Sequence, residues 1–320
     1  MHQKYQIVKV SLRMIDPQLR IPGLLMKFLF PPTMKGFRRF QKLGNRARGK
    51  KIKGFHCDET KIPSRDKGRS IRIRIYRSQD AGTDDPGILY LHGGGYAINV
   101  PESDHQTIKR FLETRNCTII APDYRKSLDQ PYPAALHDSI DTIRWMMQNH
   151  EKLRFRPDQL FIAGSSAGGG LAIATALATR NQVPIAHAFP LYPMIDYRMQ
   201  TESMKDNNAP VWSELHNRLA WKLYLRNTPQ IDELASPSLA EDLTNLPPAT
   251  TFIGDLDPFR DETSEFFKRL KLLGIQTEIK IFERAFHAFE IVNPRAKVSR
   301  KAIGFLKKAF NKAVDNSFSE

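Results

Sequence analysis

Cysteine is scarce in this chain: its 320 residues include only Cys57 and Cys117. Two cysteines cannot build the disulfide framework that stabilises small secreted folds. Cys117 opens an apolar run that predicts a buried strand, so its expected role is packing. The fold must therefore rest on an apolar core. The hydrophobic content of 41% suffices for one large α/β domain or two small ones.

Long hydrophobic runs are also missing. The most apolar N-terminal stretch, residues 21–30, is interrupted by Pro22 and Lys27 and is too short to span a bilayer. It lacks the small-residue cleavage site of a secretory signal. We therefore expect a soluble, cytoplasmic protein without stable membrane insertion. Weak peripheral contact through the basic N-terminus is the alternative.

Acidic residues are rare in the first quarter of the chain. Residues 1–80 hold 21 Lys and Arg against 5 Asp and Glu, whereas the remaining residues hold 28 Lys and Arg against 29 Asp and Glu. Such an excess attracts anionic lipid, nucleic acid or acidic substrates. No nucleic-acid-binding module or basic helix with interleaved aromatics is present, so we expect no nucleic-acid partner. The favoured interpretation is a solvated basic surface.

Strands alternate with helical stretches from about residue 69. Ile71, Ile73 and Ile75 alternate with Arg72 and Arg74, a period of two that predicts a half-exposed strand. Further strands are predicted at 87–91, 117–121, 159–163, 185–192, 249–254 and 276–283, and helices near 104–115, 134–149, 167–179, 260–273 and 295–313. This alternation predicts an α/β fold whose mostly parallel central sheet is covered by helices on both faces.

Two segments interrupt the alternation. Residues 1–50 precede the first strand and look helical and basic, and residues 197–235 contain a helical piece near 212–226. Both are candidates for a lid over one end of the sheet. The expected organisation is therefore an N-terminal cap segment at 1–50 and a catalytic domain at 51–320 with a cap insertion around 197–235.

Residues 164–168 match the G-x-S-x-G pattern between a predicted strand and a predicted helix. A sharp turn in that context exposes the serine hydroxyl, and small neighbours let the chain segments approach closely. Ser166 would stand at the helix N-terminus, where the helix dipole favours developing negative charge. We expect Ser166 to be a nucleophile.

Three consecutive glycines, Gly93, Gly94 and Gly95, follow His92 and a buried strand. Glycines let backbone N–H groups point at an anion without interference from side chains, as a tetrahedral intermediate requires. The residue after the nucleophile, Ala167, would add another donor. His92 itself is expected to form structural hydrogen bonds.

An acid and a base should follow the serine in that order. Asp255, Asp257 and Asp261 all come shortly after the strand at 249–254, and Asp257 precedes a proline, which disfavours helical geometry there. His287 is the last histidine in the chain and lies in a loop after a predicted strand. It is the expected base, and Asp257 is the expected orienting acid.

Together these residues resemble the hormone-sensitive-lipase-like branch of the α/β-hydrolases over residues 70–315. The matching stretches are 92–96, 123–125, 131–135, 164–169, 235–237, 257–262 and 287–289. The resemblance implies an α/β-hydrolase fold with a helical cap, hydrolysis of short- to medium-chain esters, and no cofactor or metal. It also implies Asp257 as the triad acid, and an oxyanion hole from amides within Gly93–Gly95, chiefly Gly94 and Gly95, with Ala167.

Three positions depart from the family pattern. Ser165 stands where Asp is usual before the nucleophile, Gly170 where Asn is frequent, and Ala288 where Gly is frequent. None is a triad position, so we expect altered tuning of the site and retained activity.

The sequence predicts a serine carboxylesterase that acts on small-molecule esters, as a monomer or homodimer. Three alternatives stay open. The same triad could act on amides or transfer acyl groups, the scaffold could bind ligands without catalysis, or the basic N-terminus could mark an interfacial lipase.

Overall fold

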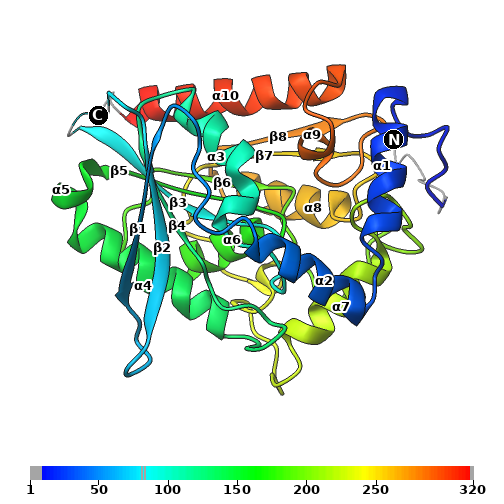
Figure 1. The fold of residues 1–320 in the computed structure, drawn as a ribbon, viewed down its shortest axis with the longest axis horizontal. Coiled ribbons are helices and arrows are strands. Elements are labelled where there is room, and N and C mark those ends of the chain that lie inside the picture. Colours follow the sequence, from blue (N-terminus) through cyan, green and yellow to red (C-terminus); the bar gives the residue numbers. More distant parts are fainter. Residues whose placement is uncertain (1–8, 81, 83, 318–320) are drawn as a thin grey trace.

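Eight strands form one sheet at the centre of the molecule (Figure 1). The computed structural model describes residues 9–80, 82 and 84–317. The strands are β1 His56–Pro63, β2 Ser70–Arg77, β3 Asp85–Leu91, β4 Thr118–Pro122, β5 Phe155–Ser165, β6 His187–Leu191, β7 Ala249–Gly254 and β8 Thr277–Phe282. Their order is β1-β2-β4-β3-β5-β6-β7-β8. β2 runs antiparallel to both of its neighbours, and the other pairs are parallel.

Helices connect the strands and lie beyond them. They are α1 Pro17–Leu29, α2 Met34–Asn45, α3 His105–Leu112, α4 Ala134–Gln148, α5 His150–Leu153, α6 Ala167–Thr179, α7 Glu214–Tyr224, α8 Arg260–Leu272, α9 Phe289–Val292 and α10 Lys297–Ser317. Two short 3₁₀ helices, Pro101–Asp104 and Pro237–Leu239, complete the set.

The handedness of the crossovers explains the layers. Parallel crossovers are right-handed, so connections that run in opposite directions along the sheet place their helices on opposite faces. The chain steps from β3 to β4 one way and from β4 to β5, β5 to β6 and β7 to β8 the other way. Accordingly α3 packs with α10 on one face, and α4, α6 and α8 cover the other (Figure 1). This is the predicted α/β-hydrolase architecture.

The sheet differs from the sequence prediction at one edge. The sequence does not predict β1, because its eight residues show no regular apolar–polar alternation and only Cys57 and Ile62 are buried. The expected half-exposed face of β2 is also wrong: the side chains of Arg72 and Arg74 are only 13% and 4% exposed. Both arginines are covered because they pair with carboxylates.

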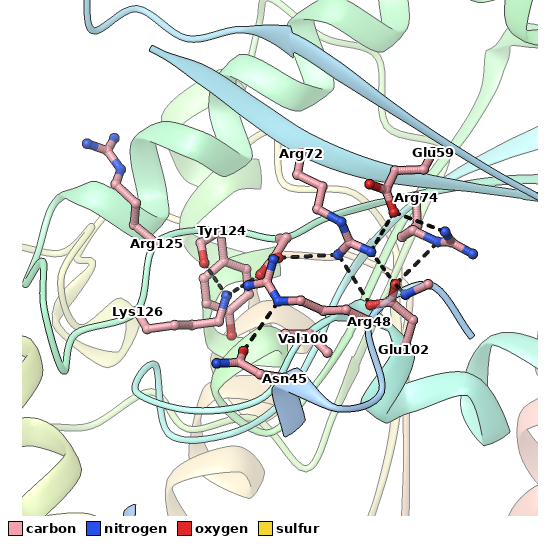
Figure 2. A network of polar contacts seen from close by, with 12 residues as sticks. Asn45, Arg48, Glu59, Arg72, Arg74, Val100, Glu102, Tyr124, Arg125 and Lys126 are labelled. Atoms are coloured by element: carbon pink, nitrogen blue, oxygen red, sulfur yellow. Dashed lines mark hydrogen bonds and ion pairs between the residues drawn. The ribbon is translucent and has the colours of Figure 1, made fainter. Parts of the chain in front are cut away.

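These carboxylates belong to a polar network between β2, the loop after β4 and the chain that follows α2 (Figure 2). Arg48 contacts Asp123 at 2.7 Å, and Lys126 contacts the other oxygen of Asp123 at 2.9 Å. Glu102 accepts hydrogen bonds from Arg72 and from the N–H of Gly49. The network thereby fastens the end of the N-terminal helical segment to the sheet.

The charges of this network shift the pKa values of its acids. Burial alone would raise the pKa of the Glu102 carboxyl, but the hydrogen bonds from Arg72 and Gly49 hold it below its usual range. Burial likewise opposes ionisation of Asp123, while Lys126 and Arg48 keep its pKa lowered. Both carboxylates are therefore charged at neutral pH, as stable buried ion pairs require.

The N-terminal helix pair, α1 and α2, packs beside α7 (Figure 1). Asp16 caps α1 by accepting from the N–H of Gln18, and Thr33 caps α2 by accepting from the N–H of Gly36. His216 of α7 donates to the carbonyl oxygen of Phe30 at 2.9 Å. Segments more than 180 residues apart are thus joined over the carboxyl-terminal edge of the sheet.

Candidate active site

The expected site residues follow strands that lie side by side. Ser166 comes directly after β5, Asp257 follows β7, and His287 follows β8. The strands from β5 to β8 are parallel neighbours, so their carboxyl ends share one edge of the sheet. Topology therefore brings together three residues that are widely separated in the sequence.

A chain of hydrogen bonds joins the three side chains. The Nε2 atom of His287 lies 2.9 Å from Oγ of Ser166, and its Nδ1 lies 2.7 Å from Oδ2 of Asp257. All three residues are at most 6% exposed. With the proton on Nδ1, His287 donates to Asp257 while Nε2 accepts from the serine hydroxyl. This arrangement can deprotonate the serine as it attacks an electrophile.

The two rival carboxylates have other partners. Asp255 accepts from the backbone N–H of Ala285 at 3.1 Å. Asp261 accepts from the N–H of Ser203 at 2.7 Å and pairs with Arg260. Asp257 also accepts from the N–H of Phe259 at 2.9 Å through its second oxygen. Of the three aspartates, Asp257 is the one that contacts His287.

Ser166 occupies a strained backbone conformation. Its φ of 56° and ψ of −118° lie outside the regions that L-residues favour. The turn is tight enough that a Cβ on Gly168 would lie 2.0 Å from the carbonyl oxygen of Leu91, and one on Gly164 would lie 2.3 Å from that of Gly168. Glycine is therefore required on both sides of the serine, as the sequence pattern indicated.

The backbone N–H groups of the glycine loop after β3 differ in whether they have a hydrogen-bond acceptor. The N–H of Gly93 donates to Asp104 at 3.1 Å, so it is not free for a substrate. Gly94 and Gly95 have positive φ values of 121° and 58°, which glycine alone adopts readily. Within the described part of the chain, the N–H groups of Gly94, Gly95 and Ala167 have no acceptor. All four amides stay predicted anion-binding donors, and Gly93 is the one whose N–H already has an acceptor in the structure.

A buried polar group behind the loop escaped the sequence analysis. Tyr90 donates to Asp104 at 2.9 Å, and its hydroxyl lies 2.7 Å from that of Ser165, the residue before the nucleophile. Burial raises the pKa of the Asp104 carboxyl, and the hydrogen bonds from Gly93 and Tyr90 partly offset this. The unusual Ser165 is the one sequence feature that points to this buried group. No sequence motif links Ser165 to Asp104.

His92 has the structural role expected of it. It is fully buried, donates to the carbonyl oxygen of Gly93 at 2.8 Å, and stacks on the ring of Tyr124 at 4.1 Å. Burial, together with the nearby charge of Lys126, holds the pKa of His92 well below its usual range. It therefore stays neutral and supports the loop.

A pocket of about 230 Å³ opens above the serine. Ser166 and His287 form its floor, and its walls are largely apolar. Met26, Phe30 and Phe40 of the N-terminal segment and Trp212 near α7 contribute to these walls. An apolar pocket with a few convergent polar groups is typical of a small-molecule site.

The described residues contain no group of three or more His, Cys, Asp or Glu side chains that could hold a metal ion. Among the helices described, none is both long and apolar enough to cross a membrane.

Comparison with known proteins places these features in a family context. A family model described as alpha/beta hydrolase fold matches residues 88–291. Carboxylesterase NlhH from Mycobacterium tuberculosis is 25% identical over 93% of this chain and 97% of its own. Ethyl acetate hydrolase from Pseudomonas putida is 26% identical over 79% of this chain and 81% of its own. The crystal structure of esterase LipW from Mycobacterium marinum superimposes with a TM-score of 0.86 at 29% identity, covering 96% and 98% of the two chains.

Proposed function

Because the chain belongs to the α/β-hydrolase fold family, we propose that it is a serine carboxylesterase for short- to medium-chain esters. The observation that carries this proposal is the hydrogen-bonded chain Ser166–His287–Asp257 beneath an apolar pocket. Relatives named as carboxylesterase, ethyl acetate hydrolase and arylesterase support the same reaction class.

The proposed reaction proceeds through an acyl-enzyme. Oγ of Ser166 attacks the ester carbonyl carbon while Nε2 of His287 takes the hydroxyl proton. The tetrahedral intermediate collapses, and His287 returns that proton to the departing alcohol. Water then repeats the sequence on the acyl-enzyme, with His287 again accepting and returning a proton. Asp257 holds the productive tautomer and stabilises the imidazolium.

The negative oxygen of the intermediate is assigned to the amides of Gly94, Gly95 and Ala167. Their free N–H groups support this role, and each such donor contributes about 3 kcal/mol to lowering the barrier. Gly93 contributes differently: its hydrogen bond to Asp104 fixes the start of the loop.

The cap in this proposal consists of residues 1–50, of which residues 1–8 lie outside the described residues, and the insertion at 197–235. Met26, Phe30, Phe40 and Trp212 bring apolar surface to the pocket, which favours the acyl part of an ester. The volume of about 230 Å³ suits short to medium acyl chains. The name of the Pseudomonas putida relative, ethyl acetate hydrolase, fits such small substrates.

The test is hydrolysis of p-nitrophenyl esters of increasing acyl length by the wild type and by Ser166→Ala. We expect turnover that peaks at short to medium chains and falls at least about 10⁴-fold in the variant. Matched p-nitroanilide amides separate an esterase from an amidase. Full activity of a correctly folded Ser166→Ala protein, or preference for the amides, would overturn the proposal.

A further inference from the structure

The N-terminal helix α1 has an apolar face that the described protein leaves uncovered. Ile21, Leu25, Phe28 and Leu29 are 71%, 57%, 82% and 50% exposed. Their spacing of four, three and one residues puts them on one side of the helix. The inner side of α1 is also apolar and holds the buried Leu19. Packing against the protein therefore does not account for the outer stripe.

The neighbouring helix α2 adds a stripe of positive charge. Its members are exposed and line a groove of about 550 Å³. They are Lys35, Arg38, Arg39 and Lys42 of α2, with Arg46, the residue that directly follows α2. Leu29 of α1 lines the same groove, together with Leu43. No acidic residue occurs between Asp16 and Asp58, and the stripe has no ion-pair partner within the described ranges. An anionic partner would therefore meet uncompensated charge.

This combined surface adjoins the candidate active site. Phe40 lines the groove on one side and the pocket above Ser166 on the other. Met26 and Phe30 also reach the pocket from α1 and its C-terminal end. Whatever binds to the outer face of α1 and α2 is thus held beside the entrance to the pocket.

We propose that the outer face of α1 and α2 docks on a membrane surface that contains anionic phospholipids. The cations of α2 contact the phosphate headgroups, and the apolar side chains of α1 enter the boundary with the acyl chains. An apolar stripe flanked by Lys and Arg is the pattern of helices that lie in this interface. The inference concerns binding and is independent of hydrolysis.

Two other occupants fit the surface less well. A nucleic acid would use the charges of α2 but leave Phe28 and Leu25, both largely exposed, without contacts. A second copy of the chain in a symmetric pair would bring like-charged stripes together, which disfavours association. An anionic lipid surface offers phosphate groups to the cationic stripe and acyl chains to the apolar stripe at the same time.

The experiment measures sedimentation of the full chain, carrying Ser166→Ala, with two kinds of vesicle. One contains phosphatidylcholine with about 30% phosphatidylglycerol, and the other contains phosphatidylcholine alone. We expect binding to the first, weakened by added salt, and little binding to the second. Because Ser166→Ala removes the proposed nucleophile, failure of vesicle binding is distinguishable from failure of the esterase proposal.

Three variants identify the surface. The triple change Lys35→Gln, Arg38→Gln and Arg39→Gln should weaken binding on the order of 100-fold. The pair Leu25→Ser and Phe28→Ser should weaken it at least about tenfold. A control with the same loss of charge at exposed lysines away from α1 and α2 is Lys152→Gln, Lys271→Gln and Lys308→Gln, which should bind like the parent. When the three variants are made in the protein that keeps Ser166, each should hydrolyse a soluble short ester at a rate within about twofold of the wild type.

Several results would overturn the proposal. One is the absence of binding to the anionic vesicles at low salt, and another is equal loss in the control variant. Unchanged vesicle binding by the Leu25 and Phe28 variant, with displacement of the vesicles by duplex DNA, would identify a nucleic-acid surface instead. A dimer that this variant abolishes, without vesicle binding by the parent, would identify a contact between two copies.

Discussion

The Nδ1 atom of His287 lies 2.7 Å from Oδ2 of Asp257, and the two residues extend from neighbouring parallel strands. Asp255, two positions earlier, instead accepts from the backbone N–H of Ala285. The two aspartates therefore make different contacts although they occupy the same loop. Asp257 contacts the imidazole of His287, and Asp255 holds the backbone that precedes that histidine.

Asp257→Asn should lower kcat on the order of 10⁴-fold with little change in stability, because the amide favours the wrong imidazole tautomer. The matched control is Asp255→Asn, which keeps an acceptor for Ala285 and should stay within about threefold of the wild type. Steady-state kinetics on a soluble ester check both. If the two variants lose activity equally, Asp257 is not the orienting acid.

Asp104→Ala should lower kcat about 10- to 100-fold and leave KM nearly unchanged, because the loop that carries the proposed oxyanion donors loses its anchor at Gly93. Asp104→Asn should restore most of the activity, since its amide oxygen can still accept from Gly93. An effect on KM alone, or an Asn variant no better than Ala, would argue against this positioning role.

Arg72→Met should lower the free energy of unfolding by about 3 kcal/mol at neutral pH, because it leaves Glu102 and Asp123 buried with fewer partners. The pKa values of both carboxyls are lowered in the folded protein. The stabilisation they provide is present above their unfolded pKa values, near 4, and is lost as pH falls through the folded ones. Denaturant titrations should show the gap between variant and wild type narrowing below about pH 4. A gap that is constant from pH 7 to 3 would contradict this account.

Gly170→Ala should destabilise the fold by about 2 kcal/mol, because the added Cβ would lie 2.1 Å from the carbonyl oxygen of Met194 and 2.4 Å from the hydroxyl of Tyr96. Gly304→Ala is the matched control. It lies in α10 with open space around its Cβ position, and the change should stabilise by about 0.5–1 kcal/mol. Thermal denaturation measures both, and a neutral Gly170→Ala would refute the crowding argument.

The sequence by itself determined the class of fold and the order in which the candidate site residues follow one another along the chain. Periodicity located the strands from residue 69 onward, and the turns at their ends carried Ser166, Asp257 and His287. Such features are local: a glycine at a tight turn or a proline after an acid leaves its mark within a few residues. Parallel topology then follows from the alternation of strands and helices.

Tertiary structure alone decided the features that depend on distant contacts. Asp104 reaches Gly93 and Tyr90, and Arg48 reaches Asp123, across chain separations that no local pattern records. The same reason explains why Arg72 and Arg74 are buried despite their alternation with isoleucine. The alternation along a strand indicates which face is apolar. Only the assembled fold brings carboxylates against the charged face and so buries it.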